Sequence, residues 1–140
     1  MTVPIEILKI KDDLRDGYHI LCRTRINKKE FRMLLDTGSS MTIFDKKKSK
    51  DISKNQVEPN NQSVLSVGNS NIKSEYIVID EMVLGDIVLK DYKTVLIDLD
   101  YLNQHFKNNG EPQIDGIIGG DILFKYNAII DYDKKYMILY

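Results

Sequence analysis

Apolar and polar residues follow one another along this chain in short runs that are typical of β-strands. Residues 18–26 alternate roughly between apolar and polar, whereas residues 31–35 and 41–44 are mostly apolar. Alternation with a period of two indicates a strand with one buried face, and short apolar runs suit more fully buried strands. Similar runs occupy residues 5–10, 76–79, 82–84, 87–89, 92–99, 127–132 and 136–140. The pattern therefore predicts an all-β domain.

Turn residues separate these runs. Asp16-Gly17 is the strongest hairpin motif, and residues 27–30 form a second polar turn. Residues 63–74 place two strand-like arms around a Gly/Asn-rich tip, which predicts a protruding hairpin. Residues 100–113 are polar around three apolar side chains and are predicted to be a loop with room for one helical turn.

A glycine-rich block stands near the C-terminus. Gly116, Gly119 and Gly120 flank the apolar pair Ile117-Ile118, as in a segment whose backbone passes close to other backbone. Asp121 is predicted to cap a short helix over residues 122–126 by accepting bonds from its first N–H groups. The whole pattern predicts a barrel-like β domain with one short helix near the end, and residues 1–140 form a single domain.

Composition excludes several classes of function. The net charge is −1, and residues 46–50 form the only basic cluster, so no nucleic-acid partner is expected. No run approaches the ~20 apolar residues of a membrane span, so no membrane partner is expected either. No signal peptide is visible at the N-terminus, which favours a cytoplasmic location. Cys22 is the single cysteine and is expected to be a small buried hydrophobe in a strand.

The candidate chemistry lies in Asp36-Thr37-Gly38-Ser39, between the apolar runs 31–35 and 41–44. A carboxylate in a tight turn between two buried strands is held rigidly against the core. The alternative interpretation of Asp36 is a turn residue that closes a strand, where Asp and Gly are both common. The motif occurs once, so an acid–base site that needs two such carboxylates requires a second chain.

Together with the block Ile117-Ile118-Gly119 ahead of a short helix, this motif resembles the retropepsin-like aspartic proteases. The resemblance covers about residues 5–140 and implies the closed β-barrel of the acid protease fold. It also implies a homodimeric endopeptidase that needs neither a metal nor another cofactor and acts on peptide or protein substrates. Retroviral members usually carry Arg where this chain has Gly120.

The resemblance implies a role for each matching residue. Asp36 would be the catalytic carboxylate, one from each subunit, and Thr37 would brace the paired turns across the dimer axis. Gly38 would let backbone N–H groups approach the carboxylates, and Ser39 would hydrogen-bond the outer oxygen of Asp36. The substrate-binding residues would be Val67, Gly68 and Asn69 of the hairpin, acting as a flap, with Ile117 and Ile118 beneath the catalytic turn.

Other constellations are interpreted as structural. His19 falls in a predicted strand and His105 in a predicted loop, and neither has a partner at metal-ligand spacing. The chain therefore predicts no metal site and no Cys–His hydrolase. The competing function is a catalytically inactive dimerisation or peptide-binding module that keeps the fold.

Overall fold

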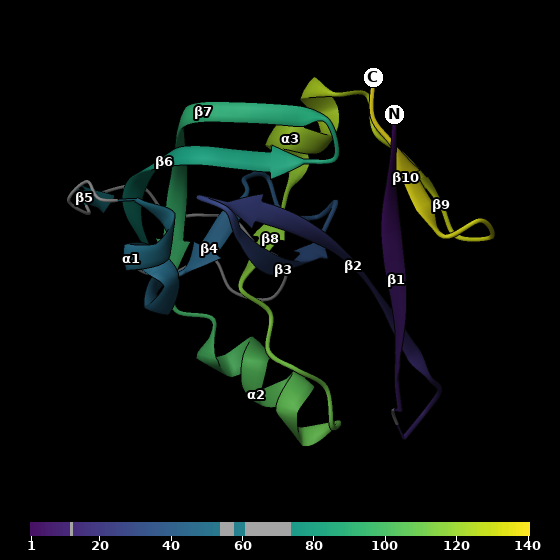
Figure 1. Cartoon of the computed structure of the whole chain (residues 1–140). Coiled ribbons are helices and arrows are strands. Elements are labelled where there is room, and N and C mark those ends of the chain that lie inside the picture. Colours follow the sequence, from purple (N-terminus) through teal and green to yellow (C-terminus); the bar gives the residue numbers. More distant parts are fainter. Residues whose placement is uncertain (12, 54–57, 61–73) are drawn as a thin grey trace.

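The structure, a computed structural model, describes residues 1–11, 13–53, 58–60 and 74–140. Strands dominate it (Figure 1). The strands are β1 Thr2–Ile10, β2 Gly17–Ile26, β3 Lys29–Leu35, β4 Ile43–Asp45, β5 Glu58–Asn60, β6 Ser74–Leu84, β7 Ile87–Ile97, β8 Gly116–Ile118, β9 Ile129–Asp131 and β10 Tyr136–Ile138. The helices are the 3-10 turn η1 Lys46–Lys48, α1 Ser49–Ile52, α2 Asp100–Asn108 and α3 Gly120–Lys125.

Six strands close into a barrel. The hydrogen-bonded order runs β6-β7-β4-β8-β3-β2, and β2 pairs with β6 to complete the ring. Two of the pairings are parallel, β3 with β8 and β4 with β7, whereas the others are antiparallel. The predicted all-β closed barrel is therefore confirmed.

The remaining strands extend the barrel. β1 pairs with β2 through Ile5–Ile10 and with β10 through Thr2–Pro4, and β10 pairs in turn with β9. The first and last strands of the chain are thus neighbours, and the two termini lie close together beside α3 (Figure 1). β5 pairs with β6 at the other end of the sheet.

Short hairpins set the register of the long strands. Asn27 and Lys28 connect β2 to β3 with φ of 48° and 70°, as a two-residue hairpin turn requires. Gly85 at φ 60° begins the turn from β6 to β7. The strands predicted from apolar runs are confirmed, except that the runs 76–79 and 82–84 form the single strand β6, and the runs 87–89 and 92–99 the single strand β7, which ends at Ile97.

The apolar side chains form two clusters. The larger fills the barrel and includes Phe44, Met82 and Ile118, each completely buried. The second includes Leu21, Leu34 and Ile117 and is covered by Phe106. Because Leu34 and Leu35 point to opposite faces of β3, they belong to different clusters. One strand therefore carries the barrel core on one side and the packing of α2 on the other.

Helix α2 corrects the predicted loop over residues 100–113. Leu99, Leu102 and Phe106 are three and four residues apart, so one face of a helix packs on the second cluster. Asn103, also on that face, is buried; its side-chain nitrogen donates to the Ile114 carbonyl at 3.0 Å and its oxygen accepts from the Ile114 N–H at 2.7 Å. The sequence did not predict this helix because most of its residues are polar and exposed, and only a few apolar side chains lie on its buried face.

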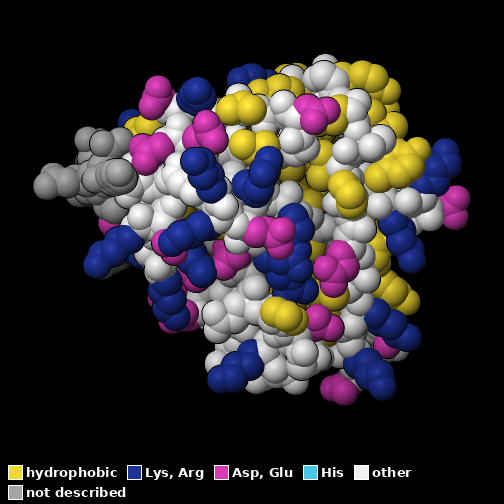
Figure 2. All heavy atoms as spheres, viewed as in Figure 1, with side chains coloured by type: hydrophobic (Ala, Val, Ile, Leu, Met, Phe, Trp, Pro, Cys, Tyr) yellow, Lys and Arg dark blue, Asp and Glu magenta, His cyan; other side chains and the backbone are white. Residues whose placement is uncertain are grey.

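Both signs of charge are mixed over the surface (Figure 2). Apolar side chains gather at the upper right, in the region of α3 and the β9–β10 hairpin (Figures 1 and 2). The exposed members, which we call the C-terminal apolar patch, are Phe124, Ile129, Tyr132 and Tyr140. Over the described ranges, every helix falls short of the length and apolar content that crossing a membrane demands.

We predict that Asn103→Ala lowers the free energy of unfolding by about 2–4 kcal/mol, because two buried backbone groups of Ile114 lose their partners. Chemical denaturation measures the change. The matched control is Gln104→Ala, whose exposed amide donates to Asn108 at 2.9 Å, and it should change stability by less than about 0.5 kcal/mol. Equal effects of the two variants would show that Asn103 does not fix the segment.

Candidate functional site

Strand β3 delivers Asp36 to the surface at the head of a tight turn. The Asp36 N–H donates to the Ile118 carbonyl at 3.1 Å, and the Ser39 N–H donates to the Asp36 carbonyl at 3.1 Å. The Gly38 N–H donates to Asp36 Oδ1 at 2.9 Å, which fixes one oxygen of the carboxylate within its own turn. Asp36 is half-buried, whereas Thr37 and Gly38 are exposed. The carboxylate is thus rigid and still open to one side.

Strand β8 supports this turn from below. It pairs in parallel with β3, with Leu34 opposite Ile117 and Leu35 opposite Ile118. The side chains of Ile117 and Ile118 are 5% and 0% exposed and lie in the second cluster and the barrel core, respectively. This position agrees with a supporting role for both residues and gives them little surface for direct contact with a substrate within one chain.

The buried residue Ser39 anchors the far end of the turn. Its hydroxyl donates to the Met41 carbonyl at 2.8 Å, rather than to the carboxylate of Asp36 as the sequence resemblance implied. The carbonyl is two residues away and completes a local turn, which competes successfully for the short hydroxyl side chain. Ser39 therefore stabilises the backbone of the turn in this chain.

The glycines after β8 let two backbones pass in close contact. A Cβ on Gly119 would lie 2.4 Å from the Met41 carbonyl oxygen and 2.9 Å from that of Ser39. The next residue, Gly120, donates its N–H to the Ser39 carbonyl at 2.7 Å, and Asp121 donates to the Ser40 carbonyl at 3.2 Å. The start of α3 is thus bonded directly to the residues that follow Asp36. The predicted close backbone passage is confirmed.

A polar network ties α3 to the strand that leaves the turn. The buried Thr42 hydroxyl donates to Asp121 Oδ1 at 2.8 Å and accepts from the Gly119 N–H at 3.1 Å. Tyr92 of β7 donates its hydroxyl to Asp121 Oδ2 at 2.5 Å. Burial raises the pKa of Tyr92 well above its ordinary value, and the neighbouring Asp121 raises it further. Tyr92 is therefore protonated and serves as a donor.

This network corrects the predicted capping role of Asp121. The N-cap of α3 is Gly119, and no side chain caps the helix. Each oxygen of the Asp121 carboxylate instead accepts a hydrogen bond from a hydroxyl, one from Thr42 just before β4 and one from Tyr92 of β7. These charge-assisted bonds satisfy both oxygens, whereas one backbone N–H would satisfy only one. The side chain of Asp121 therefore anchors α3 to Thr42 and Tyr92, and it does not cap the N–H groups at the start of the helix.

Histidine positions were the main feature that sequence reasoning missed. His19 of β2 and His105 of α2 lie with ring centroids 6.3 Å apart and 77° between planes, and His19 also contacts the Phe106 ring at 5.4 Å. Their distance along the chain hid this pairing. Within the described ranges, no group of three or more His, Cys, Asp or Glu side chains is arranged to hold a metal ion.

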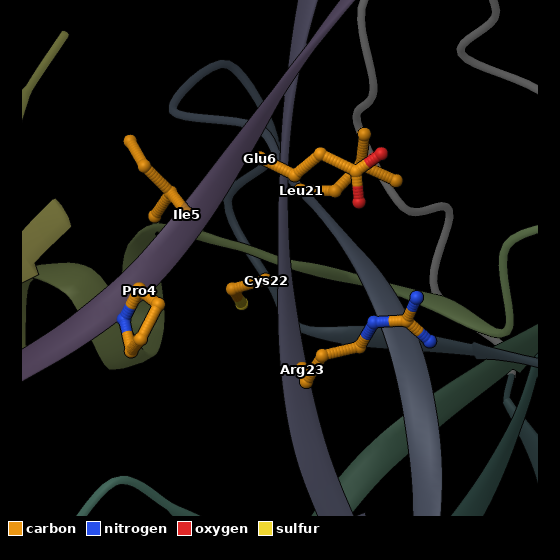
Figure 3. Close-up of a pocket in the computed structure, with 6 residues that line it drawn as sticks. All are labelled: Pro4, Ile5, Glu6, Leu21, Cys22 and Arg23. Atoms are coloured by element: carbon orange, nitrogen blue, oxygen red, sulfur yellow. The ribbon is translucent and has the colours of Figure 1, made fainter. Parts of the chain in front are cut away.

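The predicted flap residues Val67, Gly68 and Asn69 lie outside the described residues. A cavity of about 150 Å³ is present elsewhere, between β1 and β2, lined by Pro4, Ile5, Glu6, Leu21, Cys22 and Arg23 (Figure 3). It is far too small for a peptide, and its lining includes no residue of the Asp36 turn.

Cys22 lines this cavity but is not a reactive group. Its side chain is buried, as predicted, and burial raises the pKa of its thiol to about 12. The reactive thiolate is therefore negligibly populated at neutral pH.

A comparison with models of known protein families matches the region that contains the Asp36 turn. The profile of a family described as aspartyl protease matches residues 22–122, from β2 into α3. The match includes the Asp36 turn, β8 and Gly119. No protein with a curated description matches the sequence.

Solved structures share the fold at low sequence identity. A retropepsin-like aspartic protease from Rickettsia conorii superposes with a TM-score of 0.58 at 19% identity, covering 99% of this chain and 92% of that one. The retroviral protease-like domain of Ddi1 from Leishmania major gives a TM-score of 0.51 at 16% identity, covering 85% and 86%. EIAV protease complexed with the inhibitor HBY-793 gives 0.58 at 15% identity, covering 83% and 93%. The retropepsin-like fold is thus confirmed.

We predict that Gly119→Ala destabilises the protein by about 3 kcal/mol, because the added methyl group meets fixed backbone rather than a movable side chain. Gly17→Ala is the matched control: its Cβ would lie 3.8 Å from the nearest atom, the Ile10 carbonyl oxygen. Thermal or urea unfolding of the two variants measures the difference. A Gly119→Ala protein as stable as the Gly17→Ala protein would contradict the close packing of these backbones.

Proposed function

The chain belongs to the aspartyl protease family, and from that premise we propose that it is an aspartic endopeptidase that works as a homodimer. Each subunit contributes one Asp36, and the two carboxylates together activate a water molecule. The observation that carries the proposal is the intact turn of Asp36, with its carboxylate fixed by Gly38 and its backbone bonded to β8.

A second copy of the chain supplies what one turn lacks. Two carboxylates about 3 Å apart do not both ionise at low cost, so they share a proton and titrate as a pair. The charged member accepts a proton from water, and the protonated member donates one to the carbonyl oxygen of the scissile amide. Water then attacks the carbonyl carbon, and the amide breaks after the nitrogen receives a proton. Only side chains and water take part in this sequence.

The surface near the turn supports association. Thr37 and Gly38 are exposed beside the half-buried Asp36, so the open side of the turn is available to a second turn. The C-terminal apolar patch offers additional exposed apolar area beside α3, whose N-terminus bonds to the same turn (Figure 2). Exposed apolar patches of this kind mark interaction surfaces.

The substrate class that fits is an extended peptide with apolar side chains near the cleaved bond. Retropepsin-like sites bind chain segments in strand form, for which main-chain hydrogen bonds give affinity and alternating pockets give specificity. Val67, Gly68 and Asn69 are proposed as the flap that covers the peptide, and Ile117 and Ile118 as the floor beneath the catalytic turn. A closed flap would exclude bulk water during the reaction.

We predict that Asp36→Asn lowers peptide cleavage by a factor on the order of 10² to 10⁴, because the amide neither accepts the proton of water nor shares one with its partner. The measurement is hydrolysis of a fluorogenic peptide library. Asp133→Asn, an equal loss of charge at an exposed turn, should leave the rate unchanged. Folded Asp36→Asn protein with wild-type activity would refute the assignment.

We predict that inactive Asp36→Asn chains lower the activity of wild-type chains when the two are mixed. When equal amounts exchange subunits, the activity for each wild-type chain should fall to about half, since only matched wild-type pairs hold two carboxylates. Sedimentation analysis at the same concentrations verifies the dimer. Unchanged activity on mixing, or cleavage by a strictly monomeric protein, would exclude a shared site. A monomer without any cleavage would favour the inactive binding module.

We predict a bell-shaped dependence of the cleavage rate on pH, with its maximum under mildly acidic conditions. The reaction needs one charged and one protonated carboxylate in the same pair, so activity is lost when both are protonated or both are charged. Initial rates between pH 3 and pH 9 test this. A rate that rises continuously from pH 5 to pH 9 would contradict the shared-proton mechanism.

A further inference from the structure

We propose that His19, which the strand register sets opposite Asp36, is a positioning residue for the catalytic carboxylate, and that the charge of its imidazole sets the pH limits of the reaction. The inference rests on the proposed function and adds to it a residue outside the Asp-Thr-Gly turn. It also gives helix α2, which carries His105, a place next to the catalytic centre.

Strand register places His19 next to Asp36. β2 and β3 are antiparallel, and the ladder ends with Ile20 opposite Leu35. Extending this register by one residue on each strand sets His19 opposite Asp36, the first residue beyond β3. The two residues are therefore cross-strand neighbours at the end of the ladder.

Both side chains emerge on the same face of the sheet. His19 and Leu21 are two residues apart on β2, and Leu34 and Asp36 are two apart on β3, so each pair shares a face. Leu21 and Leu34 are paired in the ladder and belong to the second cluster. The imidazole and the carboxylate thus both lie at the edge of the cluster that α2 covers.

Helix α2 fixes the imidazole in place. The His19 ring contacts Phe106, which is completely buried, with 5.4 Å between centroids, and it meets His105 edge to face. His19 is half-buried by these contacts, whereas His105 is exposed. A ring packed against a buried phenylalanine keeps a constant distance from its neighbours, so a change in its charge acts on them reproducibly.

Two titratable groups act on His19 across these contacts. Burial lowers the pKa of His19, the nearby His105 lowers it further, and Asp36 raises it. β1 presents Leu8 opposite His19, and the adjacent Lys9 is paired with Asp16 at 3.0 Å. The charges that face the imidazole are therefore His105 from α2 and Asp36 from the catalytic turn.

The same interaction acts on the catalytic pair in the opposite direction. A positive imidazolium favours the charged form of a nearby carboxylate, so it helps the pair retain its single negative charge as the pH falls. As the pH rises, His19 becomes neutral, and the protonated carboxylate of the pair keeps its proton to higher pH than beside a permanent cation. Compared with a neutral residue, a titrating neighbour therefore extends the active range at low pH. Compared with a permanent cation, it extends the active range at high pH.

The first experiment follows the two imidazoles by NMR titration, which is simple because the chain has only two histidines. In Asp36→Asn the pKa of His19 should fall, because the charge that raises it is gone. In His105→Gln it should rise, because a charge that lowers it is gone. Asp133→Asn is the control and should shift neither histidine. A His19 titration that is identical in wild type and Asp36→Asn would overturn the proposal, whatever the enzymatic result.

The second experiment compares pH–rate profiles of the wild type, His19→Gln and His19→Lys. His19→Gln, which is never charged, should move the acidic limb to higher pH. His19→Lys keeps its charge throughout and should move the alkaline limb to lower pH while it preserves the acidic limb. A purely structural role would lower the rate at all pH values and leave both limbs in place, and that result would overturn the proposal.

The outcomes separate this inference from the proposed function. Active wild-type protein with limbs that do not respond to His19 refutes the inference alone. Wild-type protein without peptidase activity refutes the proposed function, and the role of His19 in it falls as well. Coupled titration of His19 and Asp36, together with limbs that move in the two stated directions, supports both.

Discussion

The geometry of the site depends on one short parallel pairing, that of β3 with β8. Asp36 is the first residue beyond β3, and its N–H is bonded to Ile118 as if the strand continued. β8 lies between β3 and β4, so it supports the strands on both sides of the catalytic turn at once. Three residues of β8, from Gly116 to Ile118, thus hold the carboxylate in register with the barrel.

That pairing is secured by α3 through polar contacts with the residues around β4 and with β7. The sequence resemblance implied an arginine at the position that Gly120 occupies in this chain. In this chain the adjacent Asp121 connects α3 to the rest of the site, because its carboxylate accepts hydrogen bonds from the hydroxyls of Thr42 and Tyr92. Gly120, free of a side chain, bonds through its backbone to Ser39.

Much of the fold could be predicted from local pattern, and the site only in part. Strands that carry Leu34, Ile43 or Val95 are apolar enough to identify without tertiary information. The helix that begins at Asp100 was missed because its stability comes from burial of Phe106 and from Asn103, and both contacts involve distant partners. The turn that begins at Asp36 was recognisable from its Asp-Thr-Gly-Ser motif and the apolar strands on both sides.

The acceptor of each polar side chain was not predictable in the same way. Ser39 and Asp121 have several local and distant partners within reach, and the choice among them is decided by backbone packing that no short motif encodes. The proximity of His19 to His105 likewise follows from strand register and helix placement together. The residue type tells which hydrogen bonds and charges a side chain can offer, whereas tertiary packing decides which partner it contacts.

The way α2 is attached has a consequence for the architecture of the barrel. The chain leaves the barrel after β7 and re-enters at β8, but β4 lies between these strands, and Asn103 joins the helix to Ile114 just before re-entry. The segment between β7 and β8 is therefore held together by its own hydrogen bonds, and it does not interrupt the strand pairings of the barrel. The connection between β7 and β8 can therefore carry a helix that packs beside β3 while every pairing that closes the barrel is kept.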